Sequence, residues 1–209
     1  MRKRVPIFFV ILTLYLLHCS PNAQFISRHY SRPHTLAILP TINHTSDVNG
    51  AIVFRNLLYV YLAQKNYSSL LSNTVVDSLL NQAGITAGGQ LKTISIKELF
   101  QMLQVDGLLF VELQECNYLT IGLLERRTVR AHLWLILPPE RLVWEDTREV
   151  DHLQTEVLDT LDDPEKLLKK SVSQLGEQLA IKGLKMWLLE HELKPEMIEV
   201  IHQLLRRLP

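Results

Sequence analysis

Cys19 is the residue whose type and position point most directly to a chemical modification. It follows Leu16-Leu17-His18 at the end of an apolar run. A bacterial lipoprotein signal places Leu three residues before a Cys that receives acyl chains, and usually carries Gly, Ala or Ser directly before that Cys. His18 departs from this pattern. We predict that Cys19 is lipidated, with an uncleaved membrane anchor or simple secretion as the alternatives.

The residues before Cys19 have the composition of a secretory signal peptide. Residues 2–4 are basic, and residues 5–17 are almost purely apolar. A helix needs about 20 apolar residues to cross a bilayer core, so this run is too short. We predict a signal peptide over 1–18, a lipid-anchored tether over 19–33 and an exported domain over 34–209. Ser20 replaces the Asp that would retain a lipoprotein in the inner membrane, which favours the outer membrane.

The remaining chemistry-bearing residues do not form a recognisable catalytic or metal-binding pattern. The eight histidines are scattered, and His29, His34 and His44 have spacings that do not suit a metal. His132 lies on a predicted strand and is expected to be structural. We predict no catalytic, cofactor or metal site. The alternative is an envelope hydrolase or ligand-binding enzyme that uses the acidic strand end, whose residues are Glu145, Asp146, Glu149 and Asp151.

Two further segments could carry chemistry but have simpler explanations. Cys116 is the other of two cysteines, and we expect a free thiol on the sheet if Cys19 is acylated. If Cys19 is not acylated, a disulfide between the two is the alternative in an oxidising periplasm. Residues 87–90 (AGGQ) contain two glycines without the Lys that a phosphate cradle requires, which predicts a turn or hinge.

The elements that must position these residues alternate along the chain. Hydrophobic periodicity and turn residues predict strands at 34–40 and 67–71, a turn at 41–50, and helices at 51–66, 73–84 and 95–104. Ser95 and Glu98 form a capping box for the last of these. Strands follow at 106–116, 127–137 and 141–150, then a C-terminal helical region over about 164–209. This order predicts a single α/β (α+β-like) domain with a mixed sheet and helices packed on it.

The patterns also predict which side chains face the core. Alternation places one set of the 127–137 strand on a single side: Val129, Ala131, Leu133, Leu135 and Leu137. Asn73 or Thr74 is expected to cap the helix at 73–84, with Val75 among its inward residues. The last helix carries an apolar side that packs on its own domain, binds a partner or second copy, or contacts the membrane surface: Met197, Ile201, Leu204 and Leu208. A formal net charge of zero argues against a nucleic-acid binder.

Four blocks of residues resemble a known family. LAILPTINHTSDVNG, VVDSLLNQAGIT, DGLLFVEL and LVWEDTRE occur in this order over residues 34–150. Together with Cys19, they resemble a family of bacterial lipoproteins of unknown function that includes a genome-derived neisserial antigen. The resemblance does not extend to residues 160–209.

The resemblance implies a fold and a place of action. It implies a periplasm-facing lipoprotein domain similar to the N-terminal domain of TolB, a fold associated with envelope assembly and transport. It also implies a partner, a lipoprotein similar to the curli secretion channel. The family has no agreed catalytic residue, so Cys19 is the one position carried over. We therefore expect a non-enzymatic binding or scaffolding accessory of a periplasmic or outer-membrane assembly or secretion complex.

Overall fold

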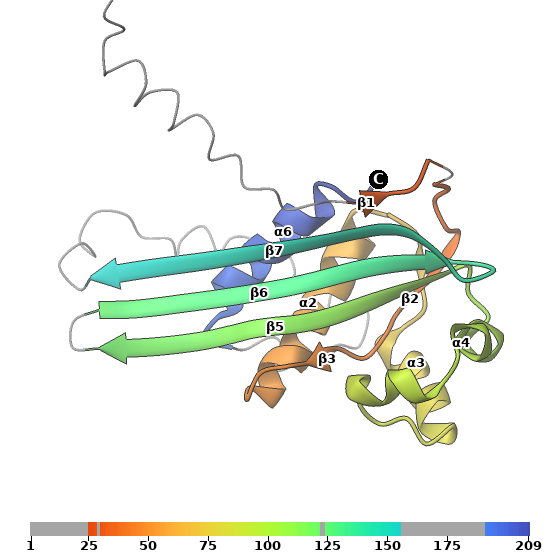
Figure 1. Ribbon diagram of the computed structural model, residues 1–209, viewed down its shortest axis with the longest axis horizontal. Coiled ribbons are helices and arrows are strands. Elements are labelled where there is room, and N and C mark those ends of the chain that lie inside the picture. The colour runs from red at the N-terminus through yellow and green to blue at the C-terminus, as the bar shows by residue number, and fades with distance from the viewer. Residues whose placement is uncertain (1–24, 29, 122–123, 156–190) are drawn as a thin grey trace, which may run out of the picture.

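Three long antiparallel strands run across the molecule and form the centre of its sheet (Figure 1). They are β5 (Gly107–Ile121), β6 (Leu124–Leu137) and β7 (Arg141–Thr155). The computed structural model describes residues 25–28, 30–121, 124–155 and 191–209. The antiparallel pairing of β6 with β7 confirms the predicted hairpin.

Four short strands complete a mixed sheet. β2 (Thr35–Ile38) pairs with β5 in parallel, and β4 (Ser69–Leu70) pairs in parallel with β2. β3 (Ile42–Asn43) also runs parallel to β5, whereas β1 (Phe25–Ile26) is antiparallel to β7. The seven strands lie in the order β1-β7-β6-β5-β2-β4, with β3 beside β5. This mixed sheet with helices packed on it confirms the predicted fold class.

Helices cover the two faces of the sheet because strand side chains alternate between them. One face packs on α2 (Val48–Gln64) and α6 (Lys194–Leu205), and the other on α3 (Asn73–Gln82), the 3-10 helix η1 (Gly88–Thr93) and α4 (Ile96–Leu103). In β2, Leu36 and Ile38 belong to the first core, and Ala37 belongs to the second. The predicted inward residues of β6 are all buried in the first core: Val129, Ala131, Leu133, Leu135 and Leu137.

Side-chain caps fix where the helices begin. Ser95 and Glu98 form the predicted capping box, with Ser95 N–H donating to Glu98 Oε2 at 3.0 Å. Two other starts differ from the prediction. Helix α2 begins at Val48, inside the predicted turn, because the carboxylate of Asp47 accepts the Gly50 N–H at 2.8 Å. Helix α3 is capped by Ser72, rather than by either predicted residue.

Two smaller features of this region were also predicted incorrectly. Val75 is 43% exposed, because it lies in the first turn of α3 on the side away from the sheet. Ala87 caps η1 and residues 88–90 form its first turn, so this segment is not a simple turn or hinge. A Cβ on Gly88 would lie 2.2 Å from the carbonyl oxygen of Thr41, so only glycine permits η1 to approach the chain beside β3 so closely.

The predicted tether is shorter than its assigned range of 19–33. From Phe25 the chain belongs to the fold, because β1 pairs with β7 and Pro33 is buried. The hydroxyl of Tyr30 bonds to the hydroxyl of Tyr67, and Arg32 stacks over the Tyr67 ring while donating to the Tyr67 carbonyl. These contacts bury backbone and ring surface that the polar composition of residues 20–33 does not indicate.

Helix α6 packs its apolar side against its own domain. The four residues predicted to share that side are all buried: Met197, Ile201, Leu204 and Leu208. Just after the helix, the carbonyl of Arg207 accepts a hydrogen bond from the fully buried Trp144 indole at 3.1 Å. Of the three alternatives for the last helix, this contact corresponds to the first, in which the helix packs on its own domain. The part of the predicted C-terminal helical region that precedes residue 191 lies outside the described residues.

Within the described part of the chain, no helix combines the length and apolarity needed to cross a membrane.

Candidate functional site

The one predicted site residue, Cys19, lies outside the described residues, and its lipidation remains a prediction. The predicted signal peptide over 1–18 lies outside them as well. The second cysteine, Cys116, is a buried free thiol on β5, as predicted.

Two of the acidic residues of β7 are held by arginines. Asp146 is buried and accepts a hydrogen bond from Arg148 Nε at 2.9 Å, whereas Asp151 accepts one from Arg126 at 2.8 Å. The hydrogen bond from Arg126 holds the pKa of Asp151 below its ordinary value. A general acid needs a raised pKa, so this pairing argues against the hydrolase alternative.

The histidine predicted to be structural sits in a polar row on the open part of the sheet. His132 Nδ1 lies 3.2 Å from Glu112 Oε2, and its Nε2 lies 3.5 Å from Glu145 Oε2. Its ring stacks on Trp134 with a centroid distance of 4.9 Å. His44 Nε2 reaches the other oxygen of Glu112 at 2.7 Å. Each oxygen of the Glu112 carboxylate therefore has an imidazole beside it.

A different cluster brings together three reactive side chains that the sequence did not connect. Asp47 caps α2, Cys116 lies on β5 with its side chain toward α2, and His191 precedes α6. His191 Nε2 lies 2.5 Å from Asp47 Oδ2, and Cys116 Sγ donates to the same oxygen at 3.6 Å. The three ligand atoms all lie within 4.8 Å of one another.

A glycine makes this convergence possible. Gly50 is in the first turn of α2, directly beside the cluster. A Cβ at this position would lie 2.8 Å from Asp47 Oδ2 and 3.0 Å from Cys116 Sγ. Any larger residue would push the carboxylate and the thiol apart, so the small residue at position 50 is a requirement of the cluster.

The electrostatics of the cluster keep the thiol protonated. Burial raises the pKa of Cys116 to about 12, and the carboxylates of Asp47 and Glu196 add to the effect. Burial alone would raise the pKa of Asp47 too, but the hydrogen bonds from Gly50 and His191 outweigh it and the pKa is lowered. A nucleophilic cysteine needs a depressed pKa, which is the opposite of this arrangement.

The imidazole is also poorly placed to activate the thiol. His191 Nδ1 accepts the Leu193 N–H at 3.0 Å, so the ring proton belongs on Nε2, where it is donated to Asp47. Neither ring nitrogen then offers a lone pair to the thiol of Cys116. The cluster is therefore a hydrogen-bonded junction in its resting state, not a Cys–His nucleophile.

A hollow of about 280 Å³ opens onto this cluster. Asn49, Tyr118 and Glu192 line it beside the three cluster residues and Leu193. Sequence reasoning missed the site because its members are separated by 69 and 144 positions. One signal was present: Asp47 stands three residues before Gly50 at the start of an apolar helical pattern, as an N-cap residue would.

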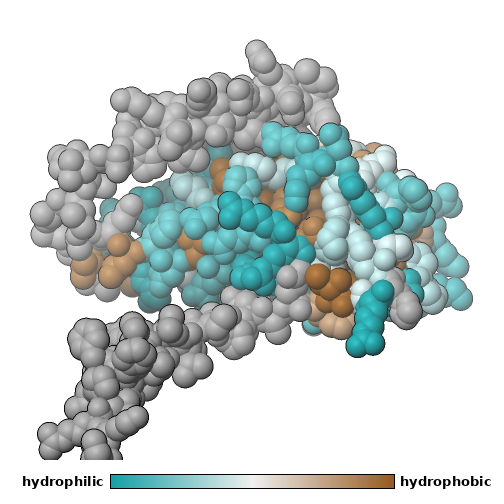
Figure 2. All heavy atoms as spheres, turned by 90° about the horizontal axis from the view of Figure 1, so that it is seen from above, coloured by the Kyte–Doolittle hydropathy of each residue, from teal (hydrophilic) through white to brown (hydrophobic). Residues whose placement is uncertain are grey.

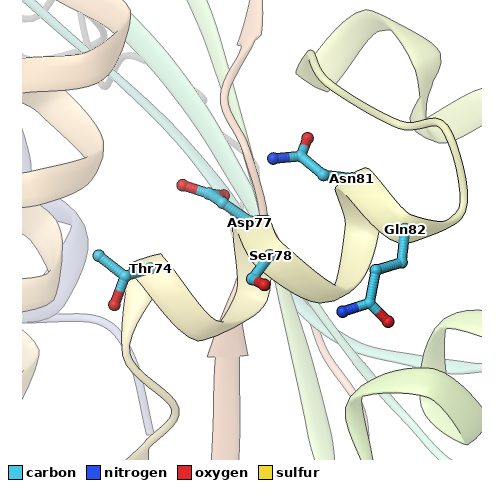
Figure 3. A pocket seen from close by; sticks show the side chains of 5 residues that line it. All are labelled: Thr74, Asp77, Ser78, Asn81 and Gln82. Carbon is cyan, nitrogen blue, oxygen red and sulfur yellow. The ribbon is translucent and has the colours of Figure 1, made fainter.

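A second hollow, of about 590 Å³, lies along the outer side of α3. Figure 3 shows that all five lining side chains come from this one helix: Thr74, Asp77, Ser78, Asn81 and Gln82. Asp77 is the one ionisable group among them, and its Oδ1 already accepts from Arg55 at 2.6 Å. This surface can hydrogen-bond a polar ligand or partner, but it offers no activated group.

Strands β5, β6 and β7 form a long ribbon, and the free end of this ribbon exposes a small apolar patch. Leu119, Leu124 and Leu153 are 51%, 43% and 68% exposed, and we call them the tip patch. Arg126 pairs with both Leu119 and Leu153, which places these three residues on one face of the ribbon, with Leu124 two positions along. In Figure 2, apolar side chains show at this end of a mostly hydrophilic face. Exposed apolar groups of this kind are typical of interaction surfaces.

A known crystal structure shares this architecture. The crystal structure of lipoprotein GNA1162 from Neisseria meningitidis superposes with a TM-score of 0.55 at 20% identity, covering 71% of this chain and 99% of that one. At this identity, the likeness concerns the fold. The PelC dodecamer from Paraburkholderia phytofirmans has a TM-score of 0.43 at 13% identity, with 61% and 78% covered. The C-terminal domain of LpoB from Escherichia coli has 0.42 at 12%, with 58% and 86% covered.

The family assignment comes from the sequence. No curated protein matches the chain at a significant level. The family described as "Putative lipoprotein GNA1162-like" matches residues 24–146, which is more than half of the chain and runs from β1 into β7. The match confirms the resemblance that the four sequence blocks predicted, and the chain belongs to the GNA1162-like lipoprotein family.

Proposed function

We propose that this protein is a lipid-anchored accessory of the bacterial cell envelope, which faces the periplasm from the outer membrane and binds a protein partner. The observation that carries the proposal is the match to a lipoprotein family in a chain that also has Cys19 after a short apolar run. In this proposal, residues 1–18 are the signal peptide, Cys19 carries the lipid, and residues 34–209 with the short N-terminal strand make up the domain.

The anchor would hold through the hydrophobic effect. Each buried CH₂ of an acyl chain contributes about 0.8 kcal/mol, and two or more chains make the attachment stable. The domain then has no need of a membrane-spanning element. Binding, rather than catalysis, is supported by the two hollows described above. One is lined by hydrogen-bonding groups of α3, and the other contains a protonated thiol and a carboxylate with a lowered pKa.

The proposed partner is another envelope protein. The family resemblance implies a lipoprotein similar to the curli secretion channel, acting in an assembly or secretion complex. The tip patch supports a protein interaction, because three leucines stand exposed together on one face at the end of the ribbon.

Fatty-acid labelling tests the anchor. Cells that express the protein and incorporate labelled palmitate should label the wild type and the Cys116→Ser variant equally, because Cys116 lies inside the fold. Cys19→Ser should abolish the label. Inhibition of lipoprotein signal peptidase should make the precursor accumulate. If Cys19→Ser is processed to the same mature size as the wild type, the lipidation proposal fails.

A further inference from the structure

Three different metal-ligand types meet where α2, β5 and the chain before α6 come together. They are the carboxylate of Asp47, the thiol of Cys116 and the imidazole of His191, with ligand atoms within 4.8 Å of one another. Each is held by its backbone: the first by its helix cap, the second by a central strand and the third by the turn that leads into α6. Neither the family description nor the sequence patterns assign a role to this set.

The geometry is close to that of a zinc site. Zinc bonds of about 2.3 Å to sulfur and about 2.0 Å to nitrogen and oxygen place tetrahedral ligand atoms about 3.3–3.6 Å apart. Cys116 Sγ and Asp47 Oδ2 are already 3.6 Å apart. The His191 Nε2 to Asp47 Oδ2 distance of 2.5 Å needs to widen by less than about 1 Å to reach that spacing.

One oxygen of Asp47 faces the other two ligand groups, while the second oxygen is held by the helix cap. Asp47 Oδ1 accepts the Gly50 N–H, which orients the carboxylate, and Oδ2 points at the thiol and the imidazole. Such an outer hydrogen bond is how proteins usually hold a metal-ligating side chain in position. The missing Cβ of Gly50 leaves the space that the three groups share.

We propose that Asp47, Cys116 and His191 bind one zinc-class divalent cation. A thiolate with an imidazole selects borderline-soft ions of this class over Mg²⁺ and Ca²⁺, which prefer oxygen ligands alone. The fourth coordination position faces the 280 Å³ hollow, which Asn49 and Glu192 also line. The ion ties the start of α2, the middle of β5 and the segment before α6 together at one point.

The protons balance without any further reactant. The thiol proton of Cys116 leaves to solvent, and the resulting thiolate and the Asp47 carboxylate together neutralise the two positive charges of the ion. The imidazole stays neutral, because its proton moves from Nε2 to Nδ1 through solvent. Leu193 N–H, which now donates to Nδ1, must then turn toward solvent. The hydrogen bonds that are lost are those from His191 and Cys116 to Asp47 and the one from Leu193 N–H to His191 Nδ1. Three bonds from the ligands to the cation replace them.

Binding of Co²⁺ and Zn²⁺ tests the site. The full chain with Cys19→Ser, purified in detergent, contains Cys116 as its single thiol. We expect one ion per chain and, with Co²⁺, the near-ultraviolet charge-transfer band of a cobalt thiolate. Cys116→Ser should abolish the band, and His191→Gln should weaken Zn²⁺ binding at least tenfold. His152→Gln, a histidine between Glu196 and Glu199, should leave both unchanged. Millimolar Mg²⁺ should not displace the ion.

Several results would overturn the proposal. They are Co²⁺ bound without the thiolate band, equal Zn²⁺ affinity in Cys116→Ser and the parent, or no binding at micromolar Zn²⁺. Thermal unfolding without metal shows whether each variant folds. If Cys116→Ser does not fold, the rate of alkylation of Cys116 in the parent chain is the deciding measurement. The proposal then requires that Zn²⁺ slow this alkylation in the parent and fail to slow it in His191→Gln.

Discussion

Glu112 shows how a single side chain on the open sheet face is held in its charged form. Burial would raise its pKa, but hydrogen bonds from Gln114, His132 and His44 outweigh that effect and the pKa is lowered. A carboxylate whose pKa is lower in the folded state adds stability above its unfolded pKa, which is about 4.3 for glutamate. That stability is lost as the pH falls through the folded pKa.

Glu112→Gln should therefore destabilise the protein near pH 6 but not in acid. The amide cannot be ionised, so the difference in the free energy of unfolding from the wild type should shrink as the pH falls below about 4. Urea unfolding at a series of pH values measures it, with Glu115→Gln on the same strand as the control. A difference that stays constant down to pH 3 would show that Glu112 acts through shape and not charge.

Contacts between residues that lie close together in the chain could be predicted from the sequence, whereas contacts between distant elements could not. The Ser95–Glu98 box was predictable because both partners lie within one helical turn. The Asp47–Cys116–His191 cluster was not, because it depends on how three distant elements pack. Arg55 is a similar case: it lies within an apolar helical pattern, yet its guanidinium is buried and donates to the Ile38 carbonyl at 2.7 Å.

Helix α6 is the element that closes the first core. Its apolar residues pack with α2 and β7, and the Trp144 indole donates to the carbonyl of Arg207 just beyond its end. Ile201 is fully buried in this contact, whereas Gln203, two positions on, is half-buried and bonds Glu199 on the outer side. The helix therefore offers a direct comparison of a core position with a surface one.

Ile201→Ala should lower the free energy of unfolding by about 2–5 kcal/mol, because it leaves a cavity in a packed core. Gln203→Ala should change it by less than about 0.5 kcal/mol. Denaturant unfolding of both variants is the measurement. If Ile201→Ala is as stable as the wild type, the apolar side of α6 contributes little to the domain and is available for a partner.

Most elements were predictable, including the short strands β2 and β4, but the two-residue strands β1 and β3 were not. β5, β6, β7 and α4 follow from alternation, helical spacing and capping over many residues. β1 and β3 are two residues each and owe their existence to pairing with a long strand, which no local pattern specifies. The same reason explains why residues 25–33 looked like a tether when read alone.

On the scale of the whole molecule, the ribbon has one end that packs in the two cores and one end that does not. Helices cover the sheet near β2 on both faces, and the far end carries the tip patch (Figure 1). The tip patch contributes little to either core, so it can change without loss of the fold. This makes it a suitable place to look for the partner.

A photo-crosslinking residue in place of Leu153 should capture an envelope protein in cells, because this side chain is the most exposed of the three leucines. The same residue in place of Gln101, an exposed position of α4, is the control. The adduct should disappear with Cys19→Ser if anchoring brings the partners together. Equal adducts from both positions would show that the tip patch is not a specific contact.

If Cys19 carries the proposed lipid, the pairing of β1 with β7 also limits how far the domain can stand from that anchor. From Cys19 to Phe25 the chain spans at most about 20 Å, against about 50 Å if the free segment ran to residue 34. A lipid-bound protein with so short a segment between its lipid and its domain is confined to a thin layer at the membrane surface. Confinement raises its effective concentration toward other proteins anchored in the same leaflet, but not toward proteins that diffuse through the periplasm. A partner with its own lipid would therefore be favoured before a single contact is made.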